Sequence, residues 1–402
     1  METLFLAHRI PFPPDRGDKI RSWNILKHLA TLGIVHLACF ADDQADAAHL
    51  PALRAALGGA LGEAHVEIRK VSRAAAAARA LLTNKPASLT LFDSPHMRAF
   101  VARTLASRDV TTLFAFSGQM AQFVPARTSA RFVMDFVDMD SAKFAAYGRS
   151  GFGPMALVNR REGARLFAWE RAVAARADTS LFVSHAEADL FRTRAGLPHA
   201  DIRALQNGVD LHFYDPSADI PTLSAPHPLI VFTGQMDYAP NAGAVTWFAD
   251  HVLPRLPGVT FAIVGRNPTD SVRALRERPG VLVTGAVDDV RTWLAAADVV
   301  AAPLLIARGV QNKVLEAMAM ARPVVASPAA FEGIEAEPGT HLLVAQSPED
   351  QASAIQSLLD DPARAHALGH AARARMVEAY RWDARLAPLA EIAGHPVRKA
   401  AA

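Results

Sequence analysis

The chain has 402 residues, of which 51% are hydrophobic and 20% are charged. One hydrophobic core rarely serves so many residues, so two folded domains are expected, and the composition excludes a largely disordered chain. The 42 Lys and Arg residues nearly balance the 40 Asp and Glu residues, and the resulting formal net charge of +2 argues against a general nucleic-acid-binding surface.

The first half of the chain alternates short apolar runs with longer helical patterns, which is typical of βαβ units and parallel sheets. Most of the runs are apolar throughout, as expected of central strands covered by helices on both faces. Strands are predicted at Thr3–Ala7, Ile34–Phe40, Val66–Ile68, Thr112–Phe116, Phe132–Phe136 and Thr179–Val183. Helices are predicted at about Lys19–Thr31, Ala45–Leu57, Ala74–Leu82, Pro95–Ala106, Ser141–Tyr147, Val158–Ala174 and Ala186–Arg194.

We expect no secretion signal, because Met1–Leu6 run directly into a strand pattern. The single cysteine, Cys39, cannot form an internal disulfide, so we expect a cytoplasmic protein. No apolar run approaches the ~20 residues that span a bilayer. The basic, alanine-rich segment Ala74–Leu82 is either an ordinary surface helix or one that lies peripherally on the cytoplasmic face of the inner membrane.

The proline-bearing segment 207–228 interrupts the pattern and is predicted to be the hinge between an N-terminal domain, residues 1–206, and a C-terminal domain, residues 229–375. The last helical region is expected to be interrupted near Tyr380 and to cross back onto the first domain over about residues 376–395. Strands are predicted at Leu229–Thr233, Thr260–Val264, Val281–Thr284, Val299–Ala302, Val324–Ala326 and His341–Val344. Helices are predicted at about Asn241–Leu253, Ser271–Arg276, Asp289–Ala296, Asn312–Met320 and Pro348–Leu359.

The stretch 308–327 carries the most chemistry. Gly309 allows backbone N–H groups to approach an anion, Lys313 adds a cation, and a helix that begins at Asn312 adds partial positive charge, so a diphosphate could bind there without a metal. Glu316 lies one turn further on the same face, where its carboxylate can accept hydrogen bonds from ribose hydroxyls. The alternative is that Lys313 and Glu316 form only a solvated ion pair.

Other loops that follow strands are also candidates, because ligands of open α/β sheets collect at the carboxyl ends of the strands. In the loop His8–Asp18, Gly17 could admit a phosphate or a sugar; alternatively, the loop is only a connection in which Asp18 caps the next helix. Gly234 and Gln235 follow the first strand of the second half, where they are predicted to face an interdomain cleft.

Three further residues of the second half are candidates at the same edge of the predicted sheet. Asn241 either faces the same cleft or only caps the next helix. Arg266 either holds a phosphate through a bidentate bond or is an ordinary surface arginine. The backbone around Val287 could pair with the edge of a base.

Other chemistries fit less well. The chain has no P-loop motif, no Gly-x-Gly-x-x-Gly after its first strand and no Gly-x-Ser-x-Gly elbow. Cysteine pairs for zinc are absent, and we expect neither a metal nor a cofactor. Asp135, Asp138 and Asp140 could bind a divalent ion in principle, but the preferred interpretation is that one of them faces the cleft and the others cap the following helix.

Several motifs are similar to those of one enzyme family: Asn207-Gly-Val-Asp210, Phe232-Thr-Gly234, Ile263-Val-Gly265 and Lys313-Val-Leu-Glu-Ala-Met-Ala319 followed by Arg322-Pro-Val-Val-Ala326. Over essentially its whole length the chain resembles the family-4 retaining glycosyltransferases, whose GT-B fold places two doubly wound Rossmann-like domains across a cleft. The segments Pro11–Ser22, Met134–Asp140 and Gly309–Lys313 resemble a narrower branch, the sugar transferases of exosortase/PEP-CTERM exopolysaccharide systems.

This resemblance implies transfer of a sugar, with retention of configuration, from a nucleotide-diphosphate donor to a glycan or lipid-linked acceptor. Glu316 would bind the donor ribose, Lys313 and Arg266 would neutralise the diphosphate, and Gly17 would close the site from the opposite domain. The implied donor-binding residues are Glu316, Gly309, Val310, Asn312, Gly17, Gly234, Gln235 and Val287. The implied catalytic residues are Lys313, Arg266 and Asp138, and His8 and Asp18 lie on the acceptor side.

Two positions depart from the family pattern. Arg308 stands where the family usually has a second glutamate, and it either turns to solvent or meets an acidic donor or a phosphate. Gly17-Asp18 replaces a common pair of glycines. Two alternative functions also stay open: a GT-B sugar-nucleotide 2-epimerase, and a non-catalytic sugar-nucleotide-binding subunit of a polysaccharide assembly complex.

Overall fold

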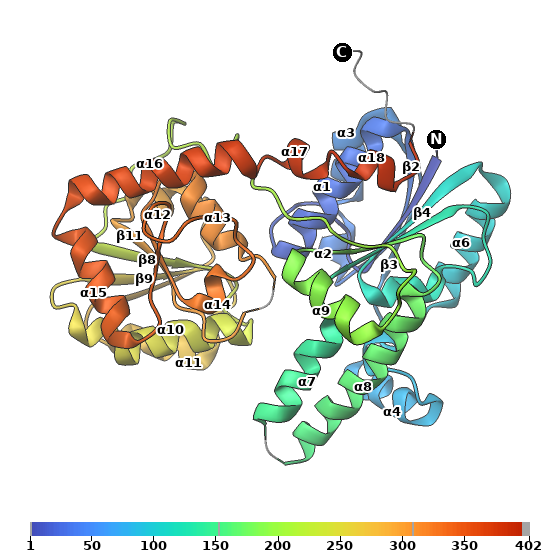
Figure 1. Cartoon of the computed structure of the whole chain (residues 1–402), viewed down its shortest axis with the longest axis horizontal. Helices are drawn as coiled ribbons and strands as arrows, with labels where there is room; N and C mark the ends of the chain where they lie inside the picture. Colours follow the sequence, from blue (N-terminus) through green and yellow to red (C-terminus); the bar gives the residue numbers. More distant parts are fainter. Residues whose placement is uncertain (1, 152, 308, 396–402) are drawn as a thin grey trace. The chain divides into compact units, whose positions relative to one another are not determined.

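The computed structural model of the chain describes residues 2–151, 153–307 and 309–395. It divides into two compact units (Figure 1). Unit 1 comprises Met1–Gln206 with Leu386–Ala402, and unit 2 comprises Asn207–Arg385. Each unit has a parallel sheet and its own cluster of buried apolar side chains.

Unit 1 contains a seven-stranded sheet in the order β3-β2-β1-β4-β5-β6-β7, with all neighbours parallel. Its strands are β1 (Glu2–Ala7), β2 (Ile34–Ala41), β3 (Leu61–Ile68), β4 (Val110–Phe116), β5 (Arg131–Val137), β6 (Thr179–Phe182) and β7 (Ile202–Ala204). The central strands are almost completely buried, as their uninterrupted apolar runs predict. The edge strand β7 was missed because three residues carry too little pattern.

The main helices of unit 1 are α1 (Gly17–Leu32), α2 (Gln44–Ala47), α3 (Leu50–Leu57), α4 (Arg73–Thr83), α5 (Ala87–Thr90), α6 (Pro95–Ser107), α7 (Asp140–Ser150), α8 (Pro154–Ala174) and α9 (His185–Ala195). The single helix predicted over Ala45–Leu57 is wrong. Two short helices stand there because Pro51, at the start of α3, has no N–H for the carbonyl of Ala47, where α2 ends.

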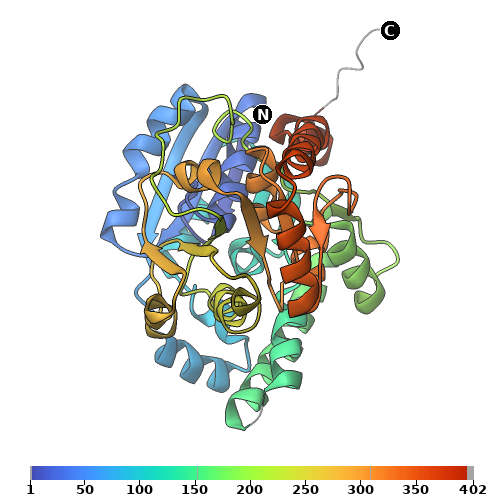
Figure 2. The same cartoon turned by 90° about the vertical axis from the view of Figure 1, so that its left-hand side faces the viewer.

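Unit 2 contains a six-stranded sheet in the order β10-β9-β8-β11-β12-β13, again parallel throughout. Figures 1 and 2 show helices on both of its faces. The strands are β8 (Leu229–Thr233), β9 (Thr260–Val264), β10 (Val281–Gly285), β11 (Val299–Ala302), β12 (Val324–Ala326) and β13 (Leu343–Val344). The helices are α10 (Ala239–His251), α11 (Asp270–Ala274), α12 (Val290–Ala296), α13 (Asn312–Ala319), α14 (Pro328–Phe331), α15 (Pro348–Leu359), α16 (Pro362–Ala379) and α17 (Trp382–Leu386).

The strand order of unit 2 fixes where a ligand can bind. From β8 the chain continues to β9 on one side, whereas β11 lies on the other side and continues to β12. The loops after β8 and β11 therefore diverge at a topological switch point, where open α/β sheets bind their ligands. These loops carry Gly234 and the start of α13.

After α16, the described residues form two short helices rather than one continuous helix. The short helix α18 (Leu389–Ile392) belongs to unit 1. Thr112 Oγ1 donates to the carbonyl of Ala393 at 2.9 Å, and Arg131 Nε donates to the carbonyl of Ile392 at 2.6 Å. Among the helices that the structure describes, none combines the length and apolarity needed to cross a membrane.

Candidate functional site

Two glycines bring the ends of β8 and β9 of unit 2 close together. Gly234 and Gly265 have φ angles of 156° and 154°. A Cβ atom on Gly265 would lie 1.6 Å from the carbonyl oxygen of Gly234, and one on Gly234 would lie 2.7 Å from Nδ2 of Asn241. Only glycine fits at these positions, so the backbone after β8 can approach a ligand closely.

The side chain of Lys313 is held at this point. Its Nζ atom donates a hydrogen bond to Oδ1 of Asn241 at 2.5 Å, and Asn241 Nδ2 donates to the carbonyl of Gln235 at 2.8 Å. The ammonium also lies 4.5 Å from the ring centroid of Phe232. Asn241 is therefore not a helix cap; it links the loop after β8 to α13.

Burial controls the charge of Lys313. Desolvation lowers the pKa of Lys313 to about 7, although the nearby carboxylate of Glu316 acts in the opposite direction. The cation is half-buried and bonded to a neutral amide, so it is not the solvated ion pair that the sequence left open.

Glu316 meets a partner that was missed from the sequence. Burial raises the pKa of Glu316 to about 7, and this rise is opposed by a hydrogen bond from Tyr214 and by the charge of Lys313. Tyr214 belongs to the segment predicted to be a hinge. Arg373 holds that segment on unit 2 by donating to the carbonyls of Tyr214 at 2.7 Å and Leu211 at 3.2 Å.

The start of α13 is tied to the same segment. Asn207 Nδ2 donates to Oδ1 of Asn312 at 3.2 Å. Gly309 has a positive φ of 65°, and Val310 is buried. Arg308, whose role the sequence left open, lies outside the described residues.

The remaining predicted donor-site residues of unit 2 lie on neighbouring loops. Arg266 follows β9, and its carbonyl accepts a hydrogen bond from the backbone N–H of Met236 at 2.9 Å, which joins the loops after β8 and β9. Val287 is half-buried in the loop after β10 and packs against the core of the unit.

In unit 1, the loop after β1 forms an ion cluster around Asp18. Arg9 Nη1 and Arg16 Nε donate to its carboxylate at 2.7 Å and 2.8 Å, and His8 Nε2 lies 3.2 Å away. Burial favours the neutral acid, but His8 and the two arginines hold the pKa of Asp18 well below its usual range. Gly17 is the first residue of α1, whose N-cap is Arg16, so Asp18 does not cap the helix.

Asp135, within β5, and Asp138 and Asp140, which follow it, have separate roles. The sequence interpretation allowed Asp135 to face a cleft or to cap the following helix. The structure shows neither role. It is fully buried and forms a bidentate pair with Arg21, at 2.9 Å and 3.2 Å. Asp138 and Asp140 instead line a pocket of unit 1. Within the described parts of the chain, no three His, Cys, Asp or Glu side chains form a group that could hold a metal ion.

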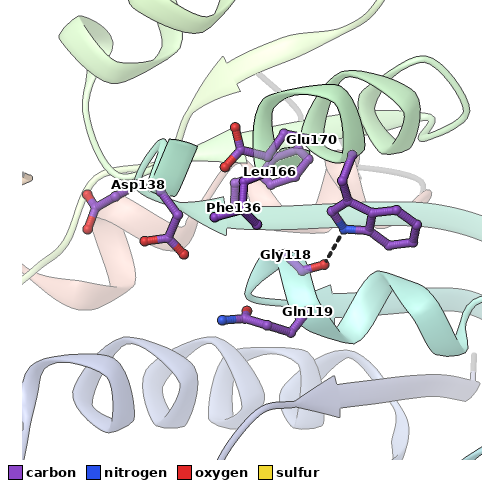
Figure 3. A pocket seen from close by; sticks show the side chains of 8 residues that line it. Gly118, Gln119, Phe136, Asp138, Leu166 and Glu170 are labelled. Atoms are coloured by element: carbon purple, nitrogen blue, oxygen red, sulfur yellow. Dashed lines mark hydrogen bonds between the residues drawn. The ribbon is translucent and has the colours of Figure 1, made fainter. Parts of the chain in front are cut away.

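This pocket is acidic and partly aromatic (Figure 3). It has room for about one water molecule. Trp169 Nε1 donates to the carbonyl of Gly118 at 2.9 Å, and Glu170 accepts from the backbone N–H and hydroxyl of Ser141. The other residues that line the pocket are Gln119, Phe136, Asp138, Asp140 and Leu166.

Asp138, predicted to be catalytic, and His8, predicted to lie on the acceptor side, carry buried polar atoms without a hydrogen-bond partner among the described residues: Oδ1 of Asp138 and Nδ1 of His8. Burial, with the neighbouring Glu187 and Asp140, raises the pKa of Asp138 to about 7. Unsatisfied buried polar atoms are uncommon in folded proteins, so each of these two atoms is a candidate partner for a water or a ligand hydroxyl.

Comparison with protein families places both units in known groups. Residues 20–213 match the model described as Glycosyltransferase Family 4, and residues 227–361 match the model described as Glycosyl transferases group 1. No curated protein gives a significant match.

Several solved structures share the fold over nearly the whole chain. Sucrose-phosphate synthase from Thermosynechococcus elongatus has a TM-score of 0.73 and 18% identity, with 98% of each chain covered. Anabaena Alr3699/HepE in complex with UDP has a TM-score of 0.69 and 17% identity, with 97% of this chain and 99% of that chain covered. WaaG, a glycosyltransferase involved in lipopolysaccharide biosynthesis, has a TM-score of 0.69 and 15% identity, with 98% of this chain and 100% of that chain covered.

These structures confirm the predicted GT-B class of two Rossmann-like α/β domains. With one glycosyltransferase model matching each part of the chain and the fold shared almost end to end, the protein is a GT-B glycosyltransferase similar to family 4.

Proposed function

We propose that the protein transfers a sugar from a nucleotide-diphosphate donor to a glycan or lipid-linked acceptor, with retention of configuration and without a metal or another cofactor. One observation carries the proposal: Lys313 is held by Asn241 at the switch point of unit 2, with Glu316 one turn further along α13. A cation and a carboxylate at this spacing suit the diphosphate and the ribose of one donor.

In this proposal the donor binds to unit 2. Lys313 neutralises the diphosphate with help from Arg266, while the backbone at Gly309 and Val310 donates hydrogen bonds to it. Glu316 accepts from the ribose hydroxyls, and the backbone near Val287 pairs with the base. Asn312, Gly234 and Gln235 line the same site.

The proposed chemistry does not require a strong base from the protein. The acceptor hydroxyl enters on the face from which the diphosphate leaves, and a phosphate oxygen of the donor takes the acceptor proton. The protein aligns the reactants and stabilises the charge that develops on the leaving group. In unit 1, the unsatisfied atoms of His8 and Asp138 support a role in hydroxyl binding, and Gly17 and Asp18 complete this part of the site.

Relatives of similar fold suggest which donors to test first. Structures of HepE contain UDP or UDP-glucose, so UDP-hexoses are the first candidates. The N-terminal and Gly309–Lys313 motifs favour a place in exopolysaccharide biosynthesis of the exosortase/PEP-CTERM type, at the cytoplasmic face of the inner membrane.

A two-step experiment tests this function. Thermal shifts with a panel of nucleotide sugars identify the donor, because binding to the folded state raises the melting temperature. Release of nucleoside diphosphate is then measured with and without lipid-linked and glycan acceptors. Acceptor-dependent release supports a transferase, release without acceptor indicates the epimerase, and binding without turnover indicates a non-catalytic subunit. NMR of the product reports its anomeric configuration, and added EDTA tests the need for a metal.

Substitution of Lys313 tests the central assignment. We expect Lys313→Ala to lower kcat about 10²–10³-fold, by analogy with the loss of one oxyanion-stabilising donor, while the protein stays folded. Lys27→Ala on α1 is the matched control, because Lys27 is exposed. Full activity of Lys313→Ala would exclude the assigned role.

A further inference from the structure

Unit 1 has a group of exposed aliphatic side chains at the end of α4 and the start of α8. Leu81 and Leu82 are 69% and 86% exposed, and Met155, Leu157 and Val158 are 66%, 64% and 57% exposed. Among the described residues of unit 1, the one other large hydrophobic side chain in this exposure class is Ile34, at 41%. Isolated exposed apolar residues are ordinary, but a contiguous group marks an interaction surface.

The two segments are joined. Arg161 Nη2 donates to the carbonyl of Ala80 at 2.8 Å, directly before Leu81. Leu157 and Val158 precede Arg161 by four and three residues, so they lie on the same face of α8 as the contact with α4. Figure 1 shows α4 beside α8 at one end of unit 1.

A second link joins α8 to the start of α5, the short helix that follows α4. The buried carboxylate of Glu162 accepts hydrogen bonds from the backbone N–H groups of Ala87 and Ser88 at 2.8 Å and 3.0 Å. The five aliphatic side chains therefore lie on segments that are bonded to one another, and we call this group the α4–α8 surface.

The charge around this surface is mainly basic, with Asp93 as an acidic neighbour that pairs with Arg79 at 3.3 Å. Between residues 69 and 92 and between residues 141 and 169, every charged residue except Glu162 is basic. Glu162 is buried and bonded, so it does not offset this charge. Apart from Arg79, which Asp93 offsets, the basic residues with exposed side chains are Lys70, Lys85, Arg149, Arg160 and Arg165. Such a local excess contrasts with the net charge of +2 for the whole chain.

We propose that the α4–α8 surface docks on an anionic lipid bilayer, with the five aliphatic side chains in the acyl boundary and the basic side chains at the headgroups. Apolar insertion and attraction to anionic lipids act together at such surfaces. The charge pattern favours a bilayer over a second copy of the chain, because two copies would bring like charges together. The proposal is independent of the identity of the donor and acceptor.

Flotation of the full chain with vesicles tests the proposal. We expect binding to vesicles of mixed phosphatidylglycerol and phosphatidylcholine, weaker binding at high salt, and little binding to phosphatidylcholine alone. Leu81→Ser with Leu82→Ser should weaken binding at least tenfold, because each leucine loses its apolar burial. Both side chains are exposed, so the fold should be unaffected. Val377→Ser, at an exposed position on α16 of unit 2, is the matched control.

A charge variant tests the electrostatic part. Lys85→Gln should weaken binding about fivefold, and Lys27→Gln on α1 should have no effect. Equal binding by the leucine variant and the wild type would overturn the proposal. A wild-type dimer that becomes a monomer on Leu81→Ser/Leu82→Ser, without vesicle binding by either form, would also overturn it and assign the surface to self-association.

Discussion

The ammonium of Lys313 on α13 is bonded to the amide oxygen of Asn241 on α10, 72 positions earlier in the chain. The other end of the amide is fixed, because Asn241 Nδ2 donates to the carbonyl of Gln235. Asn241 is itself buried, so this orientation is maintained by packing as well as by hydrogen bonds. The cation is therefore positioned before any ligand arrives, which reduces the cost of ordering it on binding.

Replacement of Asn241 should separate the effect of positioning Lys313 from the effect of added charge beside it. We expect Asn241→Ala to lower kcat/KM about 10-fold to 100-fold, because the loss of a hydrogen bond to a charged group costs about 1.5–3 kcal/mol. Asn241→Asp keeps an acceptor for Lys313 but adds a negative charge that repels the diphosphate, so donor binding should weaken. Steady-state kinetics and donor titrations measure both effects. Asn84→Asp in unit 1 is the control, and wild-type kinetics for both Asn241 variants would contradict this role.

The sequence predicted the strands of unit 2 better than the contacts of the site. Four of these strands, such as Leu229–Thr233, begin and end where expected, because short apolar runs bounded by turn residues are a local signal. The start of α13 at Asn312 was also predicted from the local pattern. The bond between Lys313 and Asn241 depends on which strands are neighbours in the sheet, and no local pattern carries that information.

Two other long-range contacts could not be predicted from local sequence either. Tyr214 follows a motif that predicts a hinge, and nothing in its neighbourhood indicates that it will reach Glu316. Arg21 lies in a helix where an arginine normally faces solvent, so its buried pairing with Asp135 was not predicted. A buried charge is recognised only once its distant partner is known, and Asp135, Asp138 and Asp140 were equally suitable from sequence alone.

The contact between Tyr214 and Glu316 can be tested by removing one hydroxyl. We expect Tyr214→Phe to weaken donor binding about fivefold, since a hydrogen bond typically contributes about 1 kcal/mol. Glu316→Gln should weaken donor binding further, because the charged acceptor for the ribose is lost. Calorimetric titration with the donor measures both, and Tyr147→Phe in unit 1 serves as the control. Unchanged affinity in Glu316→Gln would remove the ribose assignment.

Donor affinity should pass through a maximum near neutral pH. Burial lowers the pKa of Lys313 to about 7 and raises the pKa of Glu316 to about 7. Above this pH the lysine of the unliganded protein is neutral, so a diphosphate binds only with proton uptake, and affinity falls by up to about tenfold per pH unit. Below this pH the glutamate is protonated and accepts ribose hydroxyls poorly, so affinity falls again.

Variants assign the two limbs of this profile. Titrations with UDP-glucose from about pH 5.5 to about pH 8.5 should show loss of the basic limb in Lys313→Ala and loss of the acidic limb in Glu316→Gln. A nucleotide sugar is the appropriate ligand, because its diphosphate does not titrate in this range. A flat profile for the wild-type protein would contradict the titration of both groups.

The buried pair of Arg21 and Asp135 should control the stability of unit 1. Arg21 also donates to the carbonyl of Leu205 at 2.7 Å, so the pair connects α1, β5 and the end of the sheet. Burial raises the pKa of Asp135 despite the opposing effects of Arg21 and the backbone N–H of Val137. We expect Arg21→Met to lower the free energy of unfolding by about 3–5 kcal/mol, because it leaves a buried carboxylate without its cation.

A double variant distinguishes the cost of the unpaired charge from a loss of packing. Arg21→Met with Asp135→Leu removes both charges and should recover most of the lost stability, since apolar residues of similar volume often replace a buried ion pair without penalty. Urea unfolding followed by tryptophan fluorescence measures the free energy of unfolding of the wild type, Arg21→Met and the double variant. Arg127→Met, at an exposed position, is the control. A double variant as unstable as Arg21→Met would mean that the arginine acts through its packing and its bond to Leu205, whereas recovery would assign the loss to the stranded charge of Asp135.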